Sequence, residues 1–196
     1  AFSRCKSLKS VDLQNSILGV RCFYGCSALE KVTVKDTAVT CDSAFSGDSD
    51  LTLYVKADSG TIPESFWYYV STSDNTKNYA SAGFKALIIG EGITAIGTKA
   101  FYQMQDLESV ELPDSLISIG KHAFNGCSSL INIVIPNSVT TIGSSAFSGC
   151  TSLTDVTYSG TEEQWNAIII LDGNDCLKNV HFAATDKTIV AIGTCG

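Results

Sequence analysis

An alanine–phenylalanine pair recurs at a constant interval in the second half of this 196-residue chain. The pairs begin at Ala100, Ala123 and Ala146, so that each lies 23 residues after the last. Internal periodicity of this length is typical of a solenoid, in which stacked units bury one another's apolar faces. A single unit is too short to bury a core of its own, so the chain is constrained to fold as a stack.

Each unit carries the signature of one short strand followed by a turn. Residues 123–143 read Ala-Phe-x-x-Cys-x-x-Leu-x-x-Ile-x-Ile-Pro-x-x-Val-x-x-Ile-Gly. The alternating apolar residues predict a strand with one buried face, which the proline helps to end. The glycine after Ile permits either a positive φ or a close approach of two backbones. Phe101, Phe124 and Phe147 are expected to line up in single file inside the stack.

The repeat pattern divides the chain into segments. Residues 1–55 form a first block, which opens inside a unit and therefore predicts a fragment of a longer protein. Residues 56–83 interrupt the register, with a turn at 58–60, a short helix over 63–70 and a polar loop over 71–78. The register returns over residues 84–182.

The end of the array is expected to be capped. Thr161 and Gln164 form a capping-box pattern, which predicts a helix over residues 162–169 with Trp165 and Ile168 facing the last unit. Residues 183–196 are interpreted as a tail or the start of a linker. Together the segments predict about seven strands stacked along the array.

The units resemble the BspA-type leucine-rich repeats of bacterial and protist surface proteins. The matching text is IGKHAFNGCSSLINIVIPNSVTTIGSSAFSGC at residues 119–150, with YSGTEEQWNAI at 158–168 and LIIGEGITAIGTKAF at 87–101. The resemblance implies an α/β-type repeat solenoid, right-handed, curved and mostly strand and coil. It also implies a surface or secreted location and a role in adhesion or protein binding, and it brings no catalytic residues.

We therefore predict a non-catalytic module without a cofactor, whose partner is an extracellular or host protein or a glycan. The alternatives are a structural spacer and an accessory region of a larger extracellular enzyme. A net charge of −7 disfavours nucleic acid and anionic membranes as partners, because both are bound through lysine and arginine. No apolar run reaches the roughly 20 residues that span a bilayer, so no transmembrane segment is expected.

Cysteine and histidine give weak signals for chemistry. Four of the eight cysteines, Cys5, Cys26, Cys127 and Cys150, occupy one repeat position, which favours packed free thiols. Equivalent atoms of neighbouring units come close enough to leave disulfides open as the alternative. Cys22 and Cys26 have zinc-like spacing but lack a second ligand pair, so no metal site is predicted. His122 and His181 are both expected to face solvent.

The candidate binding residues lie where the strands are expected to point away from the core. The central residue of each Val-x-Ile pattern faces outward, and these residues are Asp12, Thr33, Glu111, Val134 and Thr157. An inert solvated face is the alternative to a binding face. Trp67 and Tyr68 are further candidates as an aromatic platform for a sugar or a protein, although burial against the units is the favoured interpretation of this cluster.

Overall fold

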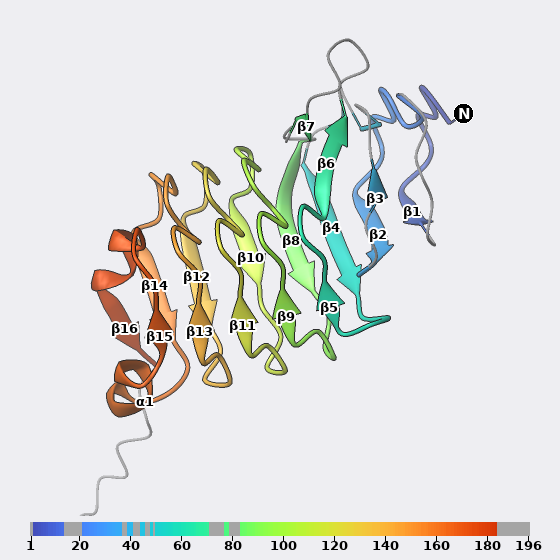
Figure 1. Ribbon diagram of the computed structural model, residues 1–196. Coiled ribbons are helices and arrows are strands. Elements are labelled where there is room, and N and C mark those ends of the chain that lie inside the picture. Colours follow the sequence, from blue (N-terminus) through green and yellow to red (C-terminus); the bar gives the residue numbers. More distant parts are fainter. Residues whose placement is uncertain are drawn as a thin grey trace, which may run out of the picture.

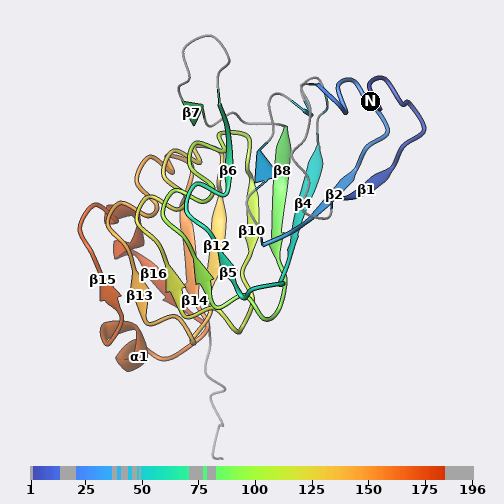
Figure 2. The same ribbon diagram turned by 45° about the vertical axis from the view of Figure 1, so that its right-hand side comes forward.

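The computed structural model describes residues 2–13, 21–36, 39–40, 44–45, 48, 50–70, 77–78 and 83–183, and only the backbone at 39–40, 67–70 and 77–78. These residues form a repeat solenoid of mostly strand and coil (Figure 1), which confirms the predicted fold class. Two parallel sheets run along its length, on opposite sides of the core (Figure 2).

The main sheet contains eight strands rather than the predicted number of about seven. All of its strand pairs are parallel, as expected when each turn of a solenoid contributes one strand. In spatial order the strands are β1 (Ser10–Leu13), β2 (Lys31–Lys35), β4 (Leu51–Lys56), β8 (Phe84–Ile89), β10 (Ser109–Glu111), β12 (Asn132–Ile135), β14 (Asp155–Tyr158) and β16 (Val180–Phe182).

The structure contains a second sheet, whose residues were not predicted from the sequence to form strands. It consists of five two-residue strands, β5 (Thr61–Ile62), β9 (Ala95–Ile96), β11 (Ser118–Ile119), β13 (Thr141–Ile142) and β15 (Ile169–Ile170). The Ile of the Ile-Gly pair is buried in β9, β11 and β13. The same residue therefore fills the core with its side chain and takes part in the second sheet with its backbone. Strand β5 belongs to the segment that interrupts the sequence pattern, and it pairs in parallel with β9.

The prediction of a helix over residues 63–70 is wrong. Pro63 directly follows β5, and Trp67–Val70 form strand β6, which pairs with β3 (Val39–Thr40) and with β7 (Lys77–Asn78). Aromatic and β-branched residues favour strands, and pairing with distant segments overrides the weak helix signal of the proline. The loop predicted over 71–78 likewise gives way to strand at β7, while residues 71–76 and 184–196 lie outside the described part.

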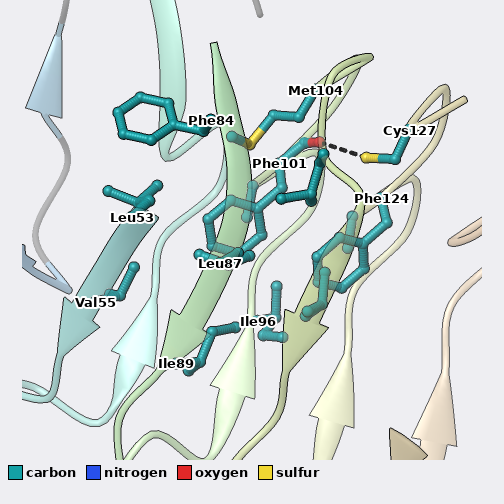
Figure 3. Close-up of a cluster of buried hydrophobic side chains, with 14 of the residues drawn as sticks. Leu53, Val55, Phe84, Leu87, Ile89, Ile96, Phe101, Met104, Phe124 and Cys127 are labelled. Carbon is teal, nitrogen blue, oxygen red and sulfur yellow. Dashed lines mark hydrogen bonds between the residues drawn. The ribbon is translucent and has the colours of Figure 1, made fainter. Parts of the chain in front are cut away.

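The phenylalanines form a single file, as predicted. Phe101, Phe124 and Phe147 are fully buried, and their ring centroids are 5.4 Å apart in both stacked pairs. Figure 3 shows Phe101 and Phe124 side by side above Leu87, Ile89 and Ile96. Phe2, Phe23 and Phe45 continue the same stacking in the first block. The core is therefore a set of like-on-like columns.

The glycine of the repeated Ile-Gly pair allows the backbones of neighbouring units to approach each other closely. A Cβ added to Gly120 would lie 2.6 Å from a backbone carbon of Gly97, and one on Gly143 would lie 2.5 Å from the Lys121 amide nitrogen. Neither glycine has a positive φ. That conformation occurs two residues later, at Lys99, His122 and Ser145, with φ of 56°, 55° and 53°.

The last described turns contain a helix and a side-chain cap. Helix α1 (Glu162–Asn166) is shorter than predicted, but its capping box is present, with Thr161 and Gln164 each accepting the other's backbone N–H. The Trp165 ring packs 5.2 Å from that of Tyr158. Trp165 and Ile168 are both packed against the core, as predicted, and β15 and β16 follow α1 in the chain and extend both sheets.

The Asn174 side chain makes hydrogen bonds to the last unit that a further unit makes elsewhere in the stack. In earlier units the Phe124 amide donates to the carbonyl of Ala146 in the next unit, at 2.8 Å. At Phe147 the Asn174 Oδ1 accepts this bond instead, at 3.1 Å, and the Asn174 amide donates to the Gly143 carbonyl at 2.9 Å. Asn174 is 7% exposed, so it satisfies backbone groups that are sealed from water.

Candidate binding face

The outward side of the main sheet presents one continuous line of side chains, which we call the outer ladder. Its members each lie one residue after a buried or half-buried residue, and strand register places them beside one another. The outer ladder contains Asp12, Thr33, Tyr54, Ile88, Glu111, Val134, Thr157 and His181. A second outward line, which includes Lys31, Thr52, Ser109, Asn132 and Asp155, runs parallel to it.

All five strand residues singled out from the sequence lie on the outer ladder. Asp12, Glu111 and Val134 are exposed and Thr157 is half-buried, as expected for this face. Thr33 differs, because its side chain is only 8% exposed. Its register neighbours are Asp12 and Tyr54, and an ion pair of 2.9 Å between Asp12 and Lys56 joins the strands on either side of it. These neighbours cover the threonine.

Sequence reasoning missed Tyr54 and Ile88, which occupy the centre of the outer ladder. The register shifts between Leu51 and Thr52, and this irregularity hid the pattern. The signal was nevertheless present, since Leu53-Tyr54-Val55 and Leu87-Ile88-Ile89 repeat the alternation of the other strands. Tyr54 is held in place, because the Lys31 ammonium lies 4.8 Å from its ring centroid and a Cβ on Gly90 would lie 3.0 Å from its hydroxyl.

Charge is distributed unevenly along this face. Lys31, Lys35 and Lys56 lie on β2 and β4, and Lys35 forms a 3.2 Å ion pair with Asp58. Toward the other end the face carries Glu111 and Asp155. These ion pairs are half-exposed, so each contributes at most about 1 kcal/mol to stability. Their main effect is on the charge pattern of this face.

Trp67 and Tyr68 do not join the outer ladder. They lie on β6, which belongs to a separate three-stranded sheet. Their side chains fall outside the described part of the chain, so the choice between an aromatic platform and burial stays a prediction.

The column cysteines fill core positions as thiols. The Cys127 thiol donates to the Phe101 carbonyl at 3.4 Å (Figure 3). The Cys150 thiol donates to the Phe124 carbonyl at 3.2 Å. Burial, reinforced by the nearby Cys176, raises the pKa of Cys150 to about 12, so it stays protonated. Cys176 donates to the Phe147 carbonyl in the same manner, which places it in this column although its spacing did not.

The two histidines differ in their exposure to solvent. His181 is exposed, as expected, whereas His122 is partly buried and the expectation of a solvated position is wrong. Among the described residues its Nδ1 has no hydrogen-bond partner, and burial together with the charges of Lys121 and Lys99 lowers its pKa. Among the residues that the structure describes, no three His, Cys, Asp or Glu side chains are arranged to hold a metal ion.

Comparison with known proteins agrees with this geometry. The family model described as BspA type leucine rich repeat region, in six copies, matches residues 1–74 and 72–191. Within the described residues, no helix has both the length and the apolar character needed to cross a membrane. A search of curated proteins found no match.

Two solved structures illustrate the similarity. A leucine-rich repeat protein from Bacteroides ovatus ATCC 8483 is 27% identical over 93% of this chain, with a TM-score of 0.55. A leucine rich cell surface protein from Faecalibacterium prausnitzii A2-165 is 22% identical over 86% of this chain, with a TM-score of 0.36. The chain covers 44% of the first protein and 64% of the second.

Proposed function

This chain belongs to the BspA-type leucine-rich repeat family, and from that premise we propose that it is a non-catalytic module that binds another protein through the outer ladder. We further propose that it acts at the cell surface or after secretion, as the family resemblance implies. A structural spacer and an accessory region of a larger extracellular enzyme are the competing functions.

The observation that carries the proposal is the exposure of apolar groups on the outward face. Val134 is 52% exposed on the outer ladder, and Ile131, immediately before β12, is 49% exposed. Tyr54 and Ile88 are partly exposed on the same line. Apolar and aromatic groups flanked by charged residues are typical of protein interfaces, where the aromatic side chains serve as anchors.

The rigidity of the sheet supports binding without rearrangement. Every outer-ladder residue lies on a strand that is hydrogen-bonded to its neighbours, and from Thr33 to Thr157 the residues on either side of it along the strand are buried or half-buried. A face held in this manner loses little conformational entropy when a partner docks, so more of the contact energy appears as affinity.

The test separates binding from spacing. The chain is first screened against arrays of extracellular host proteins and of glycans, and the affinity of any protein ligand is then measured by biolayer interferometry. We expect Val134→Lys and Glu111→Lys to weaken that affinity at least tenfold. Ile117→Lys is the matched control, because Ile117 is 49% exposed but lies next to β11 on the other sheet, and it should change the affinity less than twofold.

Three outcomes would count against the proposal. If all three variants weaken the affinity for the ligand equally, the ligand binds elsewhere than on the outer ladder. Binding to glycans alone would replace a protein partner with a carbohydrate. The absence of any ligand, with thermal melts unchanged among the variants, would favour a spacer.

A further inference from the structure

Opposite charges lie far apart along the outward face of the main sheet. Lys31 lies on β2 and Asp155 on β14, and both side chains are exposed. Within the described residues, neither of them forms an ion pair. Strand register joins them in one line, which consists of Lys31, Thr52, Ala86, Ser109, Asn132 and Asp155. A cation and a carboxylate thus occupy the same level along the strand direction, on strands five steps apart.

A face with this pattern is complementary to itself. A two-fold axis parallel to the strands, placed between β8 and β10, turns a second copy over and reverses the order of its strands. Levels along the strand direction are kept, so Lys31 of each copy faces Asp155 of the other. Asp12 and His181, which lie on β1 and β16, face each other in the same manner, an acceptor opposite a potential donor. A dimer of this kind uses one patch twice, as two-fold dimers do.

The same operation brings apolar and aromatic groups of the outer ladder together. Tyr54 on β4 faces Val134 on β12, and Val134 is 52% exposed. The Tyr54 hydroxyl lies over Gly90, which directly follows β8, because a Cβ added to that glycine would be 3.0 Å from it. The hydroxyl therefore faces β10 of the second copy, where the exposed Glu111 can accept its hydrogen bond.

The shape of the stack allows two such faces to meet. Both sheets consist of hydrogen-bonded parallel strands, so neighbouring units are about 4.8 Å apart on both sides of the core. The stacked phenylalanine rings inside are 5.4 Å apart, which is only slightly more. A stack with nearly equal spacing throughout curves gently, so the contact extends over the middle strands as well as the ends.

We propose that the protein partner of the outer ladder is a second copy of this chain. Lys31 and Asp155 pair twice across the axis, and Tyr54 packs on Val134 between these pairs. Charge pairs fix the register and the apolar groups between them supply burial, as in other protein interfaces. This inference rests on the proposed function, because it places the partner on the same face, and it goes further by naming that partner.

Sedimentation velocity of the chain at increasing concentration tests the proposal without any other ligand. We expect a monomer–dimer equilibrium in which Lys31→Glu and Asp155→Lys each raise the Kd at least about tenfold, because like charges then face each other twice. The double variant Lys31→Glu/Asp155→Lys exchanges the two charges and should restore the Kd to within about threefold of wild type. Lys121→Glu is the matched control, since this exposed lysine follows β11 on the other sheet, and it should change the Kd less than about twofold.

A second double variant tests the position of the axis. Lys31→Glu/Glu111→Lys makes the same net change of charge, but it should not restore the dimer, because Glu111 faces β8 rather than β2. Circular dichroism spectra identical to that of wild type show that each variant is folded.

The results that would overturn the proposal are distinct. They are a chain that stays monomeric at every concentration, a dimer that is insensitive to both single variants, and a failure of Lys31→Glu/Asp155→Lys to restore it. Restoration by Lys31→Glu/Glu111→Lys would overturn the proposed axis. A monomeric chain that binds a different protein, with an affinity that Val134→Lys weakens, would exclude the second copy and leave the proposed function standing.

Discussion

Truncation of one ring in the phenylalanine file should show how the stack holds together. Phe124 is fully buried, and its ring stacks on Phe101 on one side and on Phe147 on the other, with centroids 5.4 Å apart in both cases. Phe124→Ala therefore removes two stacked pairs and leaves a cavity between units that cannot move together, because the glycine backbones are already in contact.

The expected loss follows from measured core truncations. Replacement of a buried Phe by Ala costs about 3–5 kcal/mol, and an interior position with aromatic contact on both faces belongs in the upper half of that range. Total stabilities of domains are about 5–15 kcal/mol, so the variant should lose a large fraction of its free energy of unfolding. Phe2→Ala is the matched control, because Phe2 is 58% exposed and, within the described part of the chain, its ring stacks only on Phe23. It should cost less than about 1 kcal/mol.

The assay is equilibrium unfolding in urea, followed by far-ultraviolet circular dichroism, for wild type and both variants. The midpoint should fall far more for Phe124→Ala than for Phe2→Ala. If the two variants lose similar stability, or if Phe124→Ala stays within about 1 kcal/mol of wild type, then the rings do not form the core that we describe. A reduced slope for Phe124→Ala would indicate that the units on either side of the gap unfold separately.

Three further predictions concern single residues. Asn174→Ala should cost about 2–4 kcal/mol in urea unfolding, because it leaves the Phe147 N–H and other buried backbone groups without partners, and a loss below 1 kcal/mol would refute its capping role. Burial opposes ionisation of Asp36, but hydrogen bonds from the turn at residues 58–60 outweigh it and lower its pKa, so it adds stability above about pH 4 that disappears as the pH falls through the lowered value. Asp36→Asn should flatten this acid-side loss in thermal melts, and an unchanged profile would contradict the assignment. Native Cys150 should react with iodoacetamide at pH 8 far more slowly than in urea, as followed by mass spectrometry, and fast native labelling would show that the column is open.

The features that could be predicted from the sequence are those that recur in several units. The phenylalanine file, the buried strand faces and the role of glycine each recur at several positions, so one irregular unit does not obscure them. The prediction failed over residues 63–70, because strand β6 pairs with β3, which lies far away in the chain, and local propensity does not register such a partner.

Only part of the outer ladder could be predicted from the sequence, because its other members depend on contacts between distant segments. Asp12, Glu111 and Val134 follow from the alternation alone, whereas Tyr54 and Ile88 lie next to a register shift. Burial of Thr33 and the capping by Asn174 result from side chains of other turns, so they became apparent only with the coordinates.

Identical registers between successive strands also bear on how such a protein can change in length. Ser109 pairs with Asn132 and Asn132 with Asp155, while Ser118 pairs with Thr141 on the other sheet, always one unit apart. Excision of residues 100–122 would therefore join Lys99 to Ala123 and restore the same neighbours above and below. Each such deletion or duplication alters the length of the recognition surface by about 4.8 Å while the interior chemistry stays the same. Duplication or deletion of whole repeat units in the gene can thus change the length of the protein without requiring a new core.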